Sequence, residues 1–154
     1  MYRRILVPME SDRHQAPALA HARLLARSLD ATVILAWLVT VVPTEEYFMR
    51  QVQVEPGSSG ARRKAQGEAF LQEAGEEFRS AGIDTVTRIV ITSQPPEQAI
   101  IDLAIQEGVD LILLATLPQS AVGRFLLGSV GEKVRRRSPV PVLSVGPTTA
   151  DLLE

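Results

Sequence analysis

Cysteine is absent from this 154-residue chain, and neither sign of charge is in strong excess. Without cysteine the chain has no disulfide, no thiolate nucleophile and no cysteine-ligated metal. Lys and Arg number 16 against 18 Asp and Glu, a formal net charge of -2. That balance disfavours a dedicated nucleic-acid binder, which carries a basic excess. A cysteine-free composition suits the cytoplasm, and we expect the protein there.

Long apolar runs are also missing. No stretch approaches the roughly 20 apolar residues of a membrane span, so we expect no membrane insertion. The N-terminal segment Met1–Pro8 has basic residues but lacks the apolar core of a signal peptide. Apolar residues make up 45% of the chain and charged residues 22%, which is near the average of globular proteins.

Apolar runs alternate with amphipathic segments along the sequence. Continuous apolar runs are typical of strands covered on both faces of a parallel sheet, and apolar residues three and four apart indicate helices. Five strands alternating with four helices predict an α/β fold with an open, doubly wound, Rossmann-like parallel sheet. We expect strands at 5–8, 32–39, 85–91, 110–115 and 140–145, and helices at 16–29, 61–81, 97–107 and 128–137.

The domain organisation follows from the same pattern. Residues 1–146 are expected to form a single domain, and 147–154 a frayed C-terminal tail. Prolines and glycines punctuate 43–60, which we interpret as a flexible excursion too short to be a domain.

In open parallel sheets, ligands bind at the carboxyl ends of the strands, near the point where strand order reverses. This rule places Pro8–Glu10, Ser93–Pro95 and Ala115–Pro118 on one edge. Nine further residues separate Pro118 from Gly128–Val130, which lies just before a helical segment. Small residues between a strand and a helix N-terminus are where α/β proteins hold phosphates, because free backbone N–H groups and the helix dipole favour an anion.

Taken in order, these segments resemble the universal stress protein family over essentially the whole chain. The resemblance implies the five-stranded α/β architecture, a dimer, and a role in survival under stress. Some members bind ATP or AMP, and others bind no nucleotide. The matching segments are Tyr2–Pro8, Ala18–Ala22, Glu107–Leu113 and, most specifically, Gly128–Val134 followed by Ser138–Val145.

The family's phosphate motif is incomplete here. ATP-binding members have a glycine, two residues, a second glycine, nine residues, then Gly-Ser or Gly-Thr. Ala115 and Pro118 stand where the two leading glycines belong. Proline has no N–H to give to a phosphate, and its φ is fixed. Ser93 likewise replaces the glycine of a Gly-x-Pro loop, and Glu10 replaces the aspartate after the first strand. The resemblance therefore implies weak or no ATP binding.

Two of the candidate site residues have open alternatives. Ser129 either contacts a phosphate together with nearby backbone N–H groups or simply caps the last helix. Glu10 is either a ligand contact or a solvated carboxylate stabilised by a helix dipole. If nucleotide binding is retained, the resemblance assigns it to Pro8, Met9, Glu10, Leu114, Ala115, Gly128, Ser129 and Val130.

Catalytic and metal sites are not expected. His14 and His21 lie seven residues apart, too sparse a set for a metal centre. No serine has a base that the sequence identifies, so we expect no enzyme, although slow ATP hydrolysis stays open.

Three functions remain, in this order. The first is a stress-response regulatory protein that binds ATP weakly or not at all. The second is an ATP- or AMP-binding nucleotide sensor. The third is an accessory domain acting on a transporter or kinase partner through 43–60. We expect no resident cofactor, with ATP or AMP as the possible ligand. The apolar strand at 140–145 lies at a sheet edge, which invites pairing with a second copy, so we expect a homodimer.

Overall fold

The computed structural model describes residues 1–50, 58–116 and 129–146. The predicted tail at 147–154 lies outside these ranges, as do residues 51–57 of the predicted excursion. The described elements follow the predicted order, with one helix more than expected. They are β1 (Arg4–Met9), α1 (Ala16–Leu29), β2 (Thr32–Thr40), α2 (Pro43–Arg50), α3 (Ser59–Ser80), β3 (Thr85–Thr92), α4 (Pro96–Gln106), β4 (Leu111–Ala115), α5 (Gly131–Arg137) and β5 (Val142–Val145).

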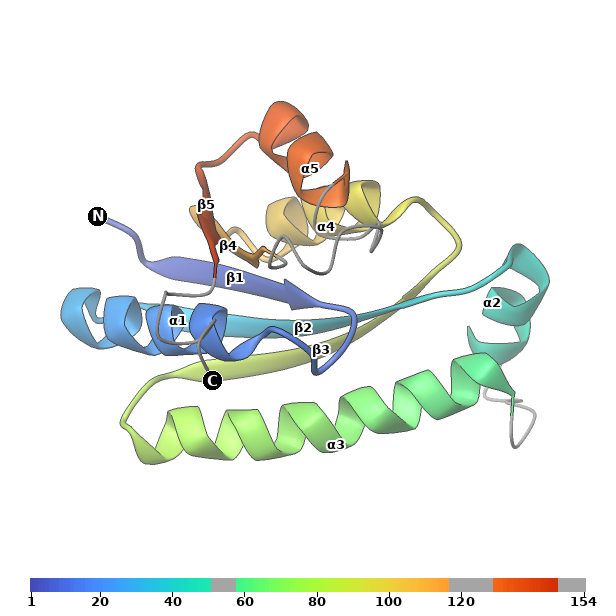
Figure 1. The fold of residues 1–154 in the computed structure, drawn as a ribbon, viewed down its shortest axis with the longest axis horizontal. Coiled ribbons are helices and arrows are strands. Elements are labelled where there is room, and N and C mark those ends of the chain that lie inside the picture. Colours follow the sequence, from blue (N-terminus) through green and yellow to red (C-terminus); the bar gives the residue numbers. More distant parts are fainter. Residues whose placement is uncertain (51–57, 117–128, 147–154) are drawn as a thin grey trace.

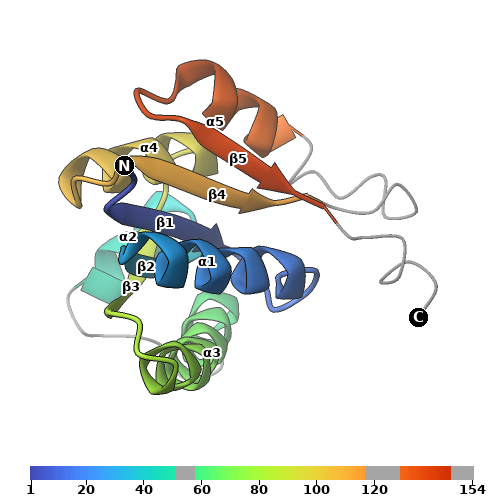
Figure 2. The same ribbon diagram turned by 90° about the vertical axis from the view of Figure 1, so that its left-hand side faces the viewer.

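All five strands are parallel and lie in the order β3-β2-β1-β4-β5. Helices α1 and α3 cover one face of this sheet, and α4 and α5 cover the other (Figures 1 and 2). The prediction of an open, doubly wound, five-stranded α/β fold is confirmed. Strand order reverses between β1 and β4, because the chain builds outward from β1 to β3 on one side and from β4 to β5 on the other.

Strand β2 shows why the apolar runs are continuous. Its side chains alternate between the two faces, and both faces are covered by helices. Val33, Leu35 and Trp37 join the core on the side of α1 and α3. Ile34 and Ala36 join the core on the side of α4 and α5. Every position from 33 to 39 is therefore buried, which favours an apolar residue at each.

The pairing of β1 with β4 stops early. The Arg4 carbonyl accepts a hydrogen bond from the Asp110 N–H, 3.0 Å away, so alternate residues of β1 turn their backbone groups toward β4. The next such positions are Leu6 and Pro8. Leu6 pairs with Ile112, and no pair follows it. Because proline lacks an N–H, the ladder cannot continue at Pro8, and this leaves an unpaired crevice at the point where strand order reverses.

Helix α2 corrects the picture of an irregular excursion at 43–60. The first half of this segment is helical. The helix has a proline at its start and acidic residues in its first turn, both of which are favourable at a helix N-terminus. The Gly60 N–H donates to the Glu45 carboxylate, and the Ser93 N–H donates to Glu46, each over 3.0 Å. These two bonds fasten α2 to α3 and to the loop after β3.

Trp37 lies where α3 packs tightly against the sheet. Its indole is fully buried, and its ring centroid lies 5.5 Å from that of Phe70 on α3. On the same helix, a Cβ added to Gly67 would overlap the indole ring. Glycine at position 67 therefore lets α3 lie directly against the tryptophan.

We predict that Gly67→Ala destabilises the fold by about 1–3 kcal/mol, because a well-packed core must shift to admit the methyl group. Urea denaturation followed by tryptophan fluorescence measures this directly. Gly75→Ala is the matched control in the same helix. Its added Cβ would lie 3.2 Å from the Arg79 guanidinium and 3.3 Å from a Thr87 methyl, and the arginine can move. A Gly67→Ala protein as stable as the parent would contradict the packing described here.

Candidate functional site

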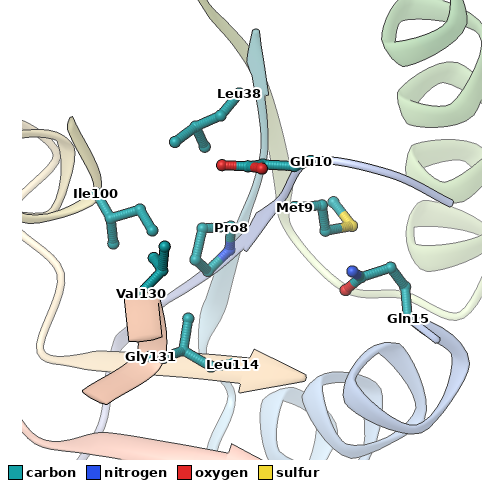
Figure 3. A pocket seen from close by; sticks show the side chains of 9 residues that line it. All are labelled: Pro8, Met9, Glu10, Gln15, Leu38, Ile100, Leu114, Val130 and Gly131. Atoms are coloured by element: carbon teal, nitrogen blue, oxygen red, sulfur yellow. The ribbon is translucent and has the colours of Figure 1, made fainter. Parts of the chain in front are cut away.

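A small cavity lies at the carboxyl ends of β1 and β4, where the two strands part. Ligands of open α/β sheets bind at such a switch point. The cavity is partly open to solvent, and its volume of about 20 Å³ is room for about one water molecule. Figure 3 shows the lining side chains, which are Pro8, Met9, Glu10, Gln15, Leu38, Ile100, Leu114, Val130 and Gly131.

Five of the eight predicted site residues line this cavity. They are Pro8, Met9, Glu10, Leu114 and Val130, drawn from two strands and the segment before α5. Residues far apart in the sequence are thus brought together as the strand-edge rule predicts.

The other three have different positions. Ala115 ends β4 but is buried in the core on the side of α1 and α3, and its methyl is not part of the cavity wall. Ser129 is exposed and directly precedes the lining residue Val130. Gly128 and Pro118 lie outside the described residues.

Helix α5 begins later than the predicted 128. It starts at Gly131, Val130 holds its N-cap position without a side-chain cap, and a π-type turn covers 129–130. Ser129 therefore lies one residue before the N-cap position of α5, and both interpretations of its side chain stay predictions. The sequence offered serine as the best cap residue, but the π-type turn moves the start of the helix beyond it.

The loop after β3 does not reach the cavity. Strand β3 is the outer strand of the sheet, separated from β1 by β2. The Ser93 N–H is used by the Glu46 carboxylate of α2, over 3.0 Å. Ser93–Pro95 therefore shares the sheet edge with the cavity, as expected, but not the cavity itself.

Glu10 is half-buried, with one carboxylate oxygen enclosed by the protein. Its Oε1 is inaccessible to water and has no hydrogen-bond partner among the described residues. Burial raises the pKa of Glu10 from 4.5 to about 7, partly offset by the positive charge of Arg63. Arg63 itself is held at the end of β2, where it donates to the Thr40 carbonyl over 2.8 Å.

Gln15 is a functional candidate that sequence reasoning missed. Only 4% of it is exposed, and its Oε1 also has no hydrogen-bond partner in the described part of the chain. The available signal in the sequence was its place in the loop that follows β1, at the edge of the sheet where ligands bind. Leu38, Ile100 and Gly131 were missed as well, and they complete the wall of the cavity.

The site is therefore an apolar pocket with two unpartnered acceptors, Glu10 and Gln15. Such a pocket suits a ligand with an apolar body and hydrogen-bond donors on its rim. Among the described residues, no three His, Asp or Glu side chains gather as metal ligands. Within the same residues, no helix has the length and apolar character needed to cross a membrane.

The fold and the position of this pocket can be compared with known proteins. The model of the universal stress protein family matches residues 1–146. The chain belongs to the universal stress protein family. Similar members include the universal stress protein MJ0531 of Methanocaldococcus jannaschii, 26% identical over 94% of this chain and 82% of that protein.

Solved structures agree with this assignment. The hypothetical protein MJ0577 superposes on this universal stress protein with a TM-score of 0.74, over 97% of this chain and 99% of the other, at 24% identity. A universal stress protein in complex with cAMP is 26% identical and superposes with a TM-score of 0.64, over 94% and 96% of the two chains. These likenesses confirm the fold expected from the sequence.

The buried carboxyl of Glu10 predicts an unusual dependence of stability on pH. Its folded pKa of about 7 lies above the ordinary 4.5, so the folded state holds the proton more tightly. The stability due to this group is fully present below about pH 4.5 and falls as pH rises toward 7. Glu10→Gln removes this titration. The variant should gain stability relative to the parent between pH 5 and pH 8, by up to about 3 kcal/mol.

Urea denaturation of both proteins at pH 5, 6, 7 and 8 gives this difference, and groups common to both cancel. A stability difference that stays constant across the series would show that the pKa of Glu10 is not raised in the folded state, and would contradict this prediction.

Proposed function

We propose that this universal stress protein is a regulatory protein that binds an adenine nucleoside monophosphate at the switch-point cavity and binds ATP weakly or not at all. The observation that carries the proposal is the cavity itself, whose mainly apolar wall includes Glu10 and Gln15, each with one oxygen unpartnered among the described residues. The proposal assigns no catalytic step to the chain, and it places the protein in the cytoplasm.

An adenine base matches the chemistry of this pocket. Pro8, Leu38 and Val130 provide apolar surface for a flat ring, and the amino group of adenine provides donors for buried acceptors. A relative 26% identical to this chain has been solved in complex with cAMP, also an adenine monophosphate. We extend that ligand class to this protein.

The sequence after β4 supports the weak binding of ATP. A charge-assisted hydrogen bond contributes about 1.5–3 kcal/mol. Pro118 cannot donate such a bond, whereas the glycine found there in ATP-binding relatives can. The loss affects the β- and γ-phosphates that this loop wraps in those relatives, and a monophosphate does not need them.

We further propose that two copies pair through β5. This strand is an outer strand of the sheet, and Leu143 on it is 39% exposed. The opposite outer strand, β3, is less available for pairing, because arginine guanidinium groups already occupy carbonyls along it. These bonds are Arg79 to Thr85 O, Arg88 to Thr87 O and Arg50 to Ile91 O, at 3.1–3.2 Å.

Isothermal titration with AMP and ATP tests the proposed ligand. We expect saturable AMP binding and ATP binding at least about tenfold weaker, in line with the loss of one charged hydrogen bond. Pro118→Gly should raise ATP affinity about tenfold and leave AMP unchanged. Ala115→Gly serves as the matched control with little effect, because the Ala115 side chain lies in the core. ATP bound more tightly than AMP by the parent protein would overturn the proposal.

Light scattering coupled to size exclusion tests the dimer. Leu143→Lys should give a monomer, because it places a charge on the proposed pairing strand. Leu24→Lys is the control. It makes the same substitution at an exposed leucine on α1, which is 63% exposed, and this variant should stay dimeric. A parent protein that is monomeric at tens of micromolar would argue against pairing through β5.

A further inference from the structure

Gln15 carries a buried amide oxygen that accepts no hydrogen bond from the described residues. Gln15 holds the N-cap position of α1, where a side chain normally accepts a bond from an N–H of the first turn. No such bond is present. The side chain is 96% buried, by its exposed fraction of 4%, and its Oε1 has no partner within the described ranges.

An orphaned acceptor of this kind is unfavourable for the folded state. A buried carbonyl loses its water and gains nothing in return, whereas an apolar side chain of the same shape avoids the loss. The preceding residue adds a second unfavourable feature, since His14 adopts a left-handed φ of 62°, which is uncommon for residues other than glycine. Features of this type cluster at ligand sites.

Gln15 lies at the wall of the cavity where β1 and β4 part. Figure 3 shows its side chain beside Met9 at the start of α1, with Glu10 on the other side of Met9. Gln15 and Glu10 both line the cavity where β1 and β4 part, and each carries an unpartnered Oε1. Both residues therefore belong to the wall of one pocket, and each carries one oxygen that lacks a partner in the described part of the chain.

We propose that Gln15 contacts the ligand and selects bases that carry an amino group. This inference rests on the proposed function, and it assigns the amide a part in choosing among nucleotides. An amino group donates to the Gln15 oxygen when the ligand is bound. A base without that group leaves the acceptor unpartnered, as it is in the empty pocket, and gains no binding from it.

The first arm of the test uses no ligand. Gln15→Leu and Gln15→Met remove the orphaned acceptor while keeping much of its volume, so both should raise the melting temperature by about 2–6 °C. Gln72→Leu makes the same chemical change at an exposed site on α3 and should leave the melting temperature unchanged. If both Gln15 variants melt lower than the parent, the amide stabilises the fold and the inference is overturned.

The second arm compares AMP with purine riboside 5′-monophosphate, the same nucleotide without its amino group. The parent and the Gln72→Leu control should prefer AMP by about tenfold, the value of one hydrogen bond. Gln15→Leu and Gln15→Met should bind the two nucleotides equally, through loss of AMP affinity. An unchanged preference in these variants would overturn the inference alone. A parent protein that binds neither nucleotide would overturn the proposed function and, with it, the role of Gln15.

Discussion

The missing N–H of Pro8 is the constraint on which the site depends. It ends the β1–β4 ladder after Leu6, at the point in the sheet where the strand order reverses. The parted strand ends leave a crevice that α1 and the segment before α5 close from either side. The two apolar cores hold this geometry, since each strand is anchored on both faces by helices. Without that anchoring, an unpaired crevice inside a parallel sheet would collapse.

The polar groups in the crevice work against stability. One oxygen of Glu10 is buried without a partner among the described residues, and the Gln15 side chain does not cap α1. His14, between them in the sequence, has a left-handed backbone conformation. Proteins retain such local conflicts where function requires them and offset them elsewhere. Here the offset comes from a fully buried β2, from the close packing of Gly67 on Trp37, and from α2, which Glu45 and Glu46 fasten to its neighbours.

Much of the fold could be predicted because burial on both faces of a parallel sheet leaves continuous apolar runs, as in β2. The strand-edge rule likewise placed Pro8–Glu10 at the ligand-binding edge of the sheet, and the family resemblance added Leu114. Other features depend on orientation, which the sequence does not encode locally. The methyl of Ala115 lies in the core. Nothing in the sequence distinguishes Gln15 from an ordinary residue at a helix start, although its side chain is buried. The sequence equally does not show that burial shifts the pKa of Glu10. Helix α2 was missed because nearby prolines and glycines suggested an irregular loop.

The central claim is that an adenine monophosphate occupies the crevice at the end of β1 and β4. The most direct measurement is an NMR titration of the isotope-labelled protein with AMP, following backbone amide shifts. The account predicts saturable shifts concentrated at Met9, Glu10, Gln15, Val130 and Gly131, the residues that line the crevice. No shifts at saturating AMP, or shifts centred on another surface such as the β3–α4 groove around Arg88 and Gln106, would contradict it.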